Sequence, residues 1–267
     1  MKNFKIVIYS DKKYEYQAIN FLNSMKYADI ENITVVYYTV GFISDLNHEN
    51  LIKVPFPLDP KLPNLVLYTP KICLHALDMF NGNFCYCDTD IIFSKRFKNF
   101  NLIFDKNFPM YCKSPLEYTF TWYSKSDGEI VYKSERKLMD YFNVPERTMH
   151  YVLGCFFTFN QNSKDFMEEW LSICENSYLL KDVEHNYPFN DETAVNVLLW
   201  KRNITENYGH KFVNTNKYET FNIVENDDNI LHMKIDDNIW EYCENSSEIY
   251  FYHGYKGNNV VEDFKLF

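Results

Sequence analysis

The pattern of apolar and polar residues begins as a strand, a helix and a second strand. Lys5–Tyr9 and Thr34–Val40 are short apolar runs rich in β-branched and aromatic residues, which predicts two strands. Between them, apolar residues recur at the spacing of one helix face, and they are Ala18, Phe21, Leu22 and Met25. A strand, helix and strand in this order predict a βαβ unit and therefore a parallel sheet.

The next segment predicts a loop and a second helix. Four prolines lie within Val54–Asn64, which we interpret as a stiff surface loop. Thr69 and Pro70 predict the start of a helix, with a hydroxyl cap followed by proline at the first helical position. Its predicted buried face is formed by Cys73, Ala76, Leu77 and Phe80, and Asn81-Gly82 predicts its end.

A continuous apolar run then ends in two carboxylates. Phe84–Cys87 is followed directly by Asp88, Thr89 and Asp90. Such a run is typical of a strand covered on both faces in a parallel sheet, and ligands of these sheets bind beyond the carboxyl ends of the strands. Side chains two residues apart on extended chain share a face, so we expect Asp88 and Asp90 to point the same way.

Two neighbouring carboxylates repel each other unless a cation lies between them or one takes a proton. Oxygen ligands suit Mn²⁺ or Mg²⁺, which leave positions for substrate phosphates. An Asp-Thr-Asp loop that caps a helix is the alternative, and it is the better interpretation of most isolated D-x-D sequences. The buried strand favours a divalent-metal site that presents a diphosphate.

The second half of the chain continues the α/β pattern. Tyr151–Phe159 predicts a strand that contains Gly154, and a helical face follows with Met167, Trp170, Leu171 and Cys174. Asp191 and Glu192 then open another predicted helix. Ile230–Ile235 and Ile249–Tyr252 predict two short strands near the end, and His253 follows the second of them. Neither a repeat nor a linker interrupts the pattern, which predicts one compact α/β domain.

Composition narrows the function classes. Apolar residues make up 46% of the chain and aromatic residues 18%, enough for a substantial core. A net charge of −10 without a Lys/Arg cluster argues against nucleic acid as a partner. We find no secretory signal and no transmembrane segment, which would need about 20 apolar residues. Seven cysteines without a C-x-x-C pair indicate reduced thiols. We therefore expect a soluble, cytoplasmic protein.

Four motifs occur in a particular order: Lys71 in a first helical turn, D-T-D after a buried strand, D-E-x-x-x-N from Asp191, and His253-Gly-Tyr-Lys256-Gly. This order resembles the metal-dependent GT-A glycosyltransferases. The D-E-x-x-x-N motif is similar to D-Q-x-x-x-N of family 8 and to D-E-S-x-x-N of family 6. The terminal motif is similar to the metal-binding and phosphate-binding segment of family 8. That family, however, has H-x-x-G-x-x-K followed by Pro-Trp, so the family stays open.

The resemblance implies a single Rossmann-like GT-A domain over residues 1–267, with a mainly parallel central sheet flanked by helices. Residues 1–100 would form its nucleotide-binding half, and residues 101–267 its acceptor half and metal-binding tail. The implied activity is hexosyl transfer, with retention expected, from a nucleotide diphosphate donor such as a UDP-sugar. The implied cofactor is Mn²⁺ or Mg²⁺, and the acceptor would be a glycan, a protein or a small molecule.

The resemblance also assigns roles. Asp88, Asp90 and His253 would bind the metal. The donor nucleotide, its phosphates and its sugar would contact Tyr9, Ser10, Asp11, Lys71, Asp88 and Lys256. Asp191 and Glu192 would face the reacting sugar, where one of them orients the acceptor hydroxyl or takes its proton.

Simpler interpretations remain open for several of these residues. Asp191 is a good N-cap, Glu192 suits a helix dipole, Lys71 suits a solvated surface, and His253-Gly254 suits a turn. A GT-A scaffold that binds nucleotide sugar without turnover is one alternative function. A haloacid-dehalogenase-type phosphatase is another, although such enzymes carry D-x-D on their first strand with Thr or Val where this chain has Ile92.

Overall fold

The computed structural model describes residues 4–28, 30, 32–93, 133–145, 154–176, 191–203, 212–214, 222–226, 231–235, 238–242 and 251–253. The α-helices are α1 (Glu15–Tyr27), α2 (Thr69–Met79), α3 (Lys133–Phe142), α4 (Lys164–Glu175) and α5 (Asp191–Lys201). Short 3-10 helices are η1 (Lys12–Tyr14), η2 (Leu65–Tyr68) and η4 (Gln161–Ser163). The strands are β1 (Phe4–Ser10), β2 (Thr34–Val40), β3 (Leu51–Phe56), β4 (Asn83–Cys87), β5 (Ile92–Phe93), β6 (Phe156–Phe159), β7 (Phe212–Asn214), β8 (Asn222–Asn226), β9 (Leu231–Ile235), β10 (Asn238–Tyr242) and β11 (Phe251–His253).

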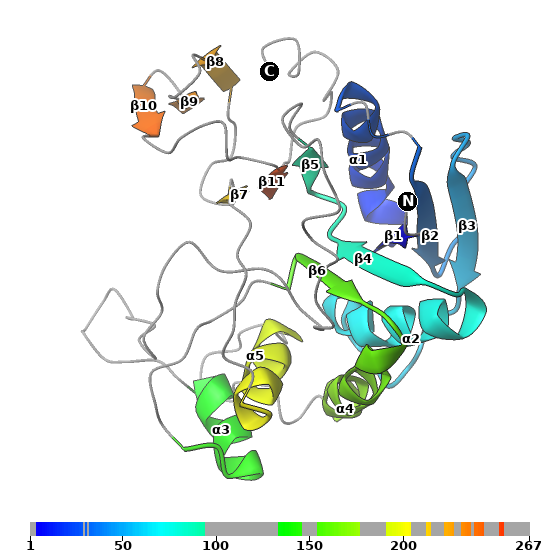
Figure 1. Cartoon of the computed structure of the whole chain (residues 1–267), viewed down its shortest axis with the longest axis vertical. Coiled ribbons are helices and arrows are strands. Elements are labelled where there is room, and N and C mark those ends of the chain that lie inside the picture. The colour runs from blue at the N-terminus through cyan, green and yellow to red at the C-terminus, as the bar shows by residue number, and fades with distance from the viewer. Residues whose placement is uncertain are drawn as a thin grey trace. The chain divides into compact units, whose positions relative to one another are not determined.

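The protein has an α/β fold with a mostly parallel, five-stranded central sheet flanked by helices, as the sequence predicts. The strand order is β3-β2-β1-β4-β6 (Figure 1). Strand β2 is parallel to both β1 and β3. Two further sheets have three strands each, in the orders β10-β9-β8 and β5-β11-β7.

Strands β1 and β4 are neighbours that run in the same direction. Near their starts, the Lys5 ammonium lies 5.8 Å from the centre of the Phe84 ring. Near their ends, the Tyr9 and Tyr86 rings lie 5.9 Å apart. The chain continues from β1 to β2 on one side, whereas β4 lies on the other side, so the strand order reverses between β1 and β4. Such a switch point is where open α/β sheets bind ligands, beyond the carboxyl ends of the two strands.

Most of the predicted core residues are buried, whereas Phe80, which follows the last residue of α2, and Leu171 are half-buried. Phe84–Cys87 are all at most 2% exposed, which confirms the buried strand before the D-T-D motif. The predicted face of α1 is buried too, and its Phe21 ring contacts the Phe93 ring of β5 edge-on at 5.3 Å. The thiols of Cys85 and Cys87 lie 3.8 Å apart on one face of β4. None of the helices in the described parts of the chain is both long and apolar enough to span a membrane.

Two predicted boundaries are wrong. The predicted loop Val54–Asn64 overlaps β3, which continues through Pro55 to Phe56. Proline is tolerated there because β3 is an edge strand that pairs only with β2, so no second ladder requires the missing N–H. Gly154 does not lie inside a strand: it forms a turn with Cys155 immediately before β6.

Thr69 is not the cap of α2. The 3-10 helix η2 runs directly into α2, so Tyr68 occupies the cap position and Thr69 is already helical. Pro70 lies in the first turn, as predicted. The Thr69 hydroxyl lies 3.2 Å from the Val66 carbonyl oxygen and also 3.2 Å from Asp191 Oδ2, two acceptors that share its one proton.

The chain divides into two compact units that interleave along the sequence. Unit 1 comprises residues 1–57, 84–106 and 210–267, and unit 2 comprises residues 58–83 and 107–209. The D-T-D motif and β11 belong to unit 1, whereas Lys71, Asp191 and Glu192 belong to unit 2. The division of one domain into residues 1–100 and 101–267 stays a prediction.

Thr39→Val is expected to stabilise the protein by about 1 kcal/mol, because a buried hydroxyl without a partner costs its desolvation energy. Thr39 is 1% exposed on β2, and no hydrogen bond from the described residues reaches its Oγ1 atom. Urea unfolding of both proteins without ligand measures the difference. A destabilised variant would show that the hydroxyl has a partner.

Candidate functional site

The D-T-D motif forms a turn at the end of β4. The Ile91 amide donates to the Asp88 carbonyl oxygen at 3.2 Å, which closes a four-residue turn. The expectation that Asp88 and Asp90 share a face of extended chain is therefore wrong, because the strand ends at Cys87 and the alternation of side chains ends with it. Asp, Thr and Asp are favourable residues for such a turn. The turn begins directly beyond the carboxyl end of β4, at the switch point.

Two hydrogen bonds fix this turn within unit 1. The Tyr86 hydroxyl donates to Asp88 Oδ1 at 2.6 Å, and the Thr89 hydroxyl donates to Gln17 Oε1 of α1 at 3.2 Å. Asp88 and Asp90 are both half-buried, and the Oδ1 atom of Asp90 is shielded from solvent. The two carboxylates are thus held at defined positions beside the sheet.

The predicted nucleotide-binding residues lie at the end of β1, on the other side of the switch point. Ser10 is 1% exposed, and its hydroxyl forms a 2.7 Å hydrogen bond with the Tyr37 hydroxyl of β2. Burial raises the pKa of Tyr37 to about 12, so its hydroxyl stays protonated at physiological pH. Asp11 Oδ1 accepts from the Tyr14 amide at 3.1 Å and thereby caps η1. Tyr9, which lies in the same strand, packs against Tyr86.

The terminal strand β11 lies beside the D-T-D segment. It pairs antiparallel with β5, with Phe251 opposite Phe93 and Tyr252 opposite Ile92. His253 is the last residue of β11 and follows Tyr252 of this pairing. The pairing joins segments that are about 160 residues apart in the sequence. Lys256 lies outside the described residues.

Of the three predicted metal ligands, the structure describes the side chains of Asp88 and Asp90. In the described part of the chain, no three His, Cys, Asp or Glu side chains lie close enough to hold a metal, and the imidazole of His253 lies outside it. Asp88 and Asp90 provide a partial set of carboxylate oxygens in one fixed turn. A cation that takes its remaining ligands from a diphosphate, water and one further side chain suits such a set.

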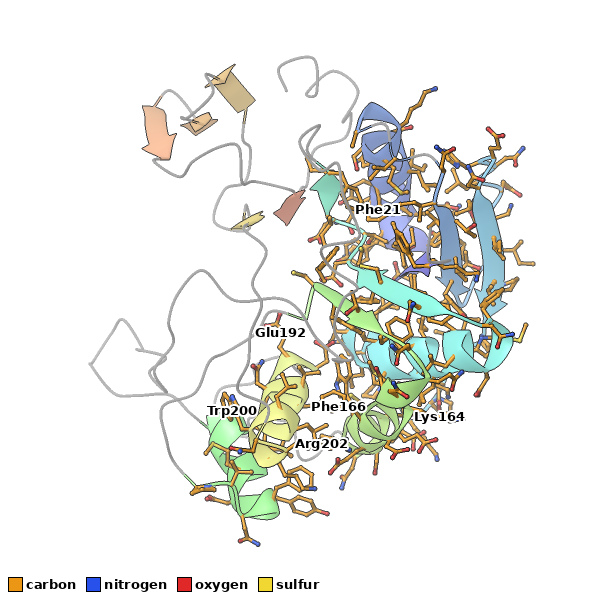
Figure 2. The ribbon with its side chains drawn as sticks, viewed as in Figure 1. Phe21, Lys164, Phe166, Glu192, Trp200 and Arg202 are labelled. Carbon is orange, nitrogen blue, oxygen red and sulfur yellow. The ribbon has the colours of Figure 1, made fainter. Side chains whose placement is uncertain are left out.

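The two other predicted motifs meet in unit 2. Figure 2 shows Glu192 at the start of α5, at the opposite end of this helix from Trp200 and Arg202. The Gly154 amide donates to Glu192 Oε1 at 3.0 Å. A Cβ atom on Gly154 would lie 3.4 Å from Glu192 Cγ, which is an ordinary contact distance. The Asn196 side chain donates to the Glu192 carbonyl at 2.8 Å.

Asp191 is the first residue of α5 and contacts α2. The Thr69 hydroxyl donates to Asp191 Oδ2 at 3.2 Å across 122 residues of sequence. The buried thiol of Cys174 on α4 lies close enough for the Asp191 charge to act on it. Burial raises the pKa of Cys174 well above its ordinary value, and Asp191 raises it further. Asp191 therefore lies where α2, α4 and α5 meet, a position that the cap interpretation does not require.

Lys71 forms an ion pair within unit 2. Its ammonium contacts Asp59, which lies in the proline-rich loop before α2. The Lys71 ammonium lowers the pKa of Asp59 below its ordinary value, and the Lys61 amide, 2.9 Å from Asp59 Oδ1, lowers it further. The Tyr68 hydroxyl accepts from the Asp59 amide at 2.6 Å. The loop that carries Asp59 is thus attached to α2 by several bonds.

Lys71→Met is expected to destabilise the protein at pH 7 by up to about 1 kcal/mol, the usual range for partly exposed ion pairs. Because the pKa of Asp59 is lowered in the folded state, its stabilisation is present above the ordinary carboxyl pKa and is lost as pH falls. Urea unfolding should show that the wild-type protein has a larger free energy of unfolding than Lys71→Met at pH 7, and that this difference disappears at pH 3. An equal gap at both pH values would contradict the ion-pair role.

Sequence reasoning missed several residues that hold the predicted ones in place: Tyr86, Gln17, Thr69 and Asp59. For Tyr86 a signal was present, since Tyr86 precedes Asp88 by only two residues. No short-range signal pairs Thr69 with Asp191 or Gln17 with Thr89.

Comparison with models of known protein families finds no match to this chain, and comparison with curated proteins finds none either.

Proposed function

We propose that this protein is a metal-dependent glycosyltransferase that moves a sugar from a nucleotide diphosphate donor to a hydroxyl group of a glycan, protein or small-molecule acceptor. A UDP-sugar is the favoured donor. The observation that carries the proposal is the position of the D-T-D turn, which lies at the switch point of the sheet, opposite the end of β1 and directly before the strand that pairs with β11.

In this proposal Asp88, Asp90 and His253 hold Mn²⁺ or Mg²⁺. When bound, the metal supplies a Lewis acid that stabilises the departing nucleotide diphosphate. Tyr9, Ser10 and Asp11 contact the base and ribose from the end of β1. Lys71 and Lys256 provide positive charge for the phosphates or the donor sugar.

Asp191 and Glu192 act on the acceptor side. Each carboxylate has its own hydrogen-bond donor, Thr69 for Asp191 and the Gly154 amide for Glu192. Such bonds fix the carboxylate positions, which a group that orients a hydroxyl or takes its proton requires. We propose that one of the two performs this step.

Thermal unfolding with UDP, GDP, CDP and TDP, each with and without Mn²⁺, tests the proposal. A ligand at 100 times its dissociation constant adds about 2.7 kcal/mol to stability. One nucleotide should raise the melting temperature strongly only when Mn²⁺ is present. The combined variant Asp88→Asn/Asp90→Asn should lose that response. Absence of any metal-dependent shift in the wild-type protein would contradict the proposal.

A further inference from the structure

The hydroxyl of Tyr86 lies against a predicted metal ligand. The distance of 2.6 Å to Asp88 Oδ1 is in the range of O–H···O⁻ bonds to a charged acceptor, which are stronger than neutral ones. Asp88 directly follows β4 and begins the turn, and the Tyr86 hydroxyl from the strand reaches its carboxylate across only two residues of sequence. The bond fixes the rotation of the Asp88 carboxylate and hence the position of its second oxygen.

Tyr86 itself is held rigidly. It is 2% exposed on β4, and its ring packs against the Tyr9 ring of β1 with the centres 5.9 Å apart. A buried ring has little rotational freedom, so the hydroxyl has a fixed position relative to the sheet. The Gln17–Thr89 bond holds the middle residue of the same turn against α1. The first two residues of the turn are therefore attached to three elements of unit 1.

We propose that Tyr86 is a positioning residue for the metal site, which acts by fixing the Asp88 carboxylate in the orientation that binds the cation. The inference rests on the proposed function, since it needs Asp88 to be a metal ligand. Groups that hydrogen-bond to metal ligands orient them, and their removal typically weakens metal binding by about 10-fold to 100-fold. A carboxylate without this bond would rotate and bind the cation less often.

The test is Mn²⁺ binding by Tyr86→Phe, measured from the electron paramagnetic resonance signal of free Mn²⁺ during titration of the full chain, with and without UDP. The variant keeps the ring and its packing but removes the hydroxyl. We expect its Mn²⁺ affinity to fall about 10-fold. Tyr68→Phe is the matched control, because Tyr68 is also 2% exposed and its hydroxyl bonds to the Asp59 amide. It should bind Mn²⁺ as the wild-type protein does.

A second measurement needs neither metal nor turnover. In metal-free protein, Tyr86→Phe should raise the equilibrium constant for unfolding about 10-fold. This is the size expected for the loss of a hydrogen bond to a charged group. The same substitution in an Asp88→Ala background should have little effect, because the acceptor is already absent. Equal effects in both backgrounds would overturn the inference.

The outcomes separate the inference from the proposed function. If the wild-type protein binds Mn²⁺ and Tyr86→Phe binds it with the same affinity, only the positioning role is overturned. A wild-type protein that binds no Mn²⁺, with or without UDP, would overturn both. Weaker Mn²⁺ binding by Tyr86→Phe together with a stability effect that depends on Asp88 would support the role.

Discussion

Asp90→Asn is expected to abolish Mn²⁺-dependent transfer while the protein stays folded. The substitution barely changes the shape of the side chain, but it removes one of the two charges that we propose to hold the metal. A metal contributes several kcal/mol of charge stabilisation, so its loss should slow transfer by about 10³-fold or more. Initial rates of nucleotide release at saturating donor measure the loss, and a circular dichroism spectrum checks the fold.

The control for this substitution is Asp78→Asn. Asp78 pairs with Lys164 on the surface of unit 2, and its side chain is 63% exposed. An effect of lost charge alone would appear in both variants, whereas loss of the metal site affects only Asp90→Asn. Full activity of Asp90→Asn with the metal still required would remove Asp90 from the site.

Asp191→Asn is expected to lower the rate of transfer by about 100-fold or more, the contribution typical of general acid–base groups. The asparagine keeps an oxygen that can accept from the Thr69 hydroxyl, so the free energy of unfolding should change by less than about 0.5 kcal/mol. A large loss of kcat with an unchanged melting temperature would assign Asp191 to the reaction rather than to the start of α5.

Two companion variants separate the possible roles of this helix start. Thr69→Val removes the donor and should cost about 1–2 kcal/mol of stability, because the half-buried Asp191 carboxylate loses a hydrogen bond. Glu192→Gln keeps an acceptor for the Gly154 amide and shows whether the second carboxylate is the reacting one. Wild-type kcat of Asp191→Asn at every pH from 5 to 9 would leave Asp191 with a structural role only.

Much of the fold follows from local patterns. The apolar runs of β1, β2 and β4 and the apolar faces of α1, α2 and α4 predict these elements with errors of a few residues. The errors have physical causes. Pro55 suggests a loop, but it lies in an edge strand, and edge position is a property of the complete sheet. Thr69 suggests a cap, but η2 continues into α2 and moves the helix start.

The candidate site is less predictable, because it depends on contacts between distant residues. The sequence singles out Gly154 and Glu192 separately, whereas only the structure shows the bond between them. The same holds for Thr69 with Asp191 and for Gln17 with Thr89. The turn at Asp88 was missed because the buried strand suggested that extended chain continues beyond Cys87. Turn-forming residues at a strand end favour a turn instead.

The central claim is metal-dependent turnover of a nucleotide sugar, and donor turnover by the purified full chain tests it most directly. Release of nucleoside diphosphate is measured from a panel of UDP-, GDP-, CDP- and TDP-sugars, with Mn²⁺ or with EDTA, and with simple sugars as acceptors. The proposed function predicts release from one class of donor that requires Mn²⁺ and is lost in Asp88→Asn/Asp90→Asn. If nucleotide binds in the presence of Mn²⁺ but no donor is turned over, the protein is instead a binding scaffold. If nucleotide release is unchanged by EDTA and by the double substitution, the metal site is contradicted.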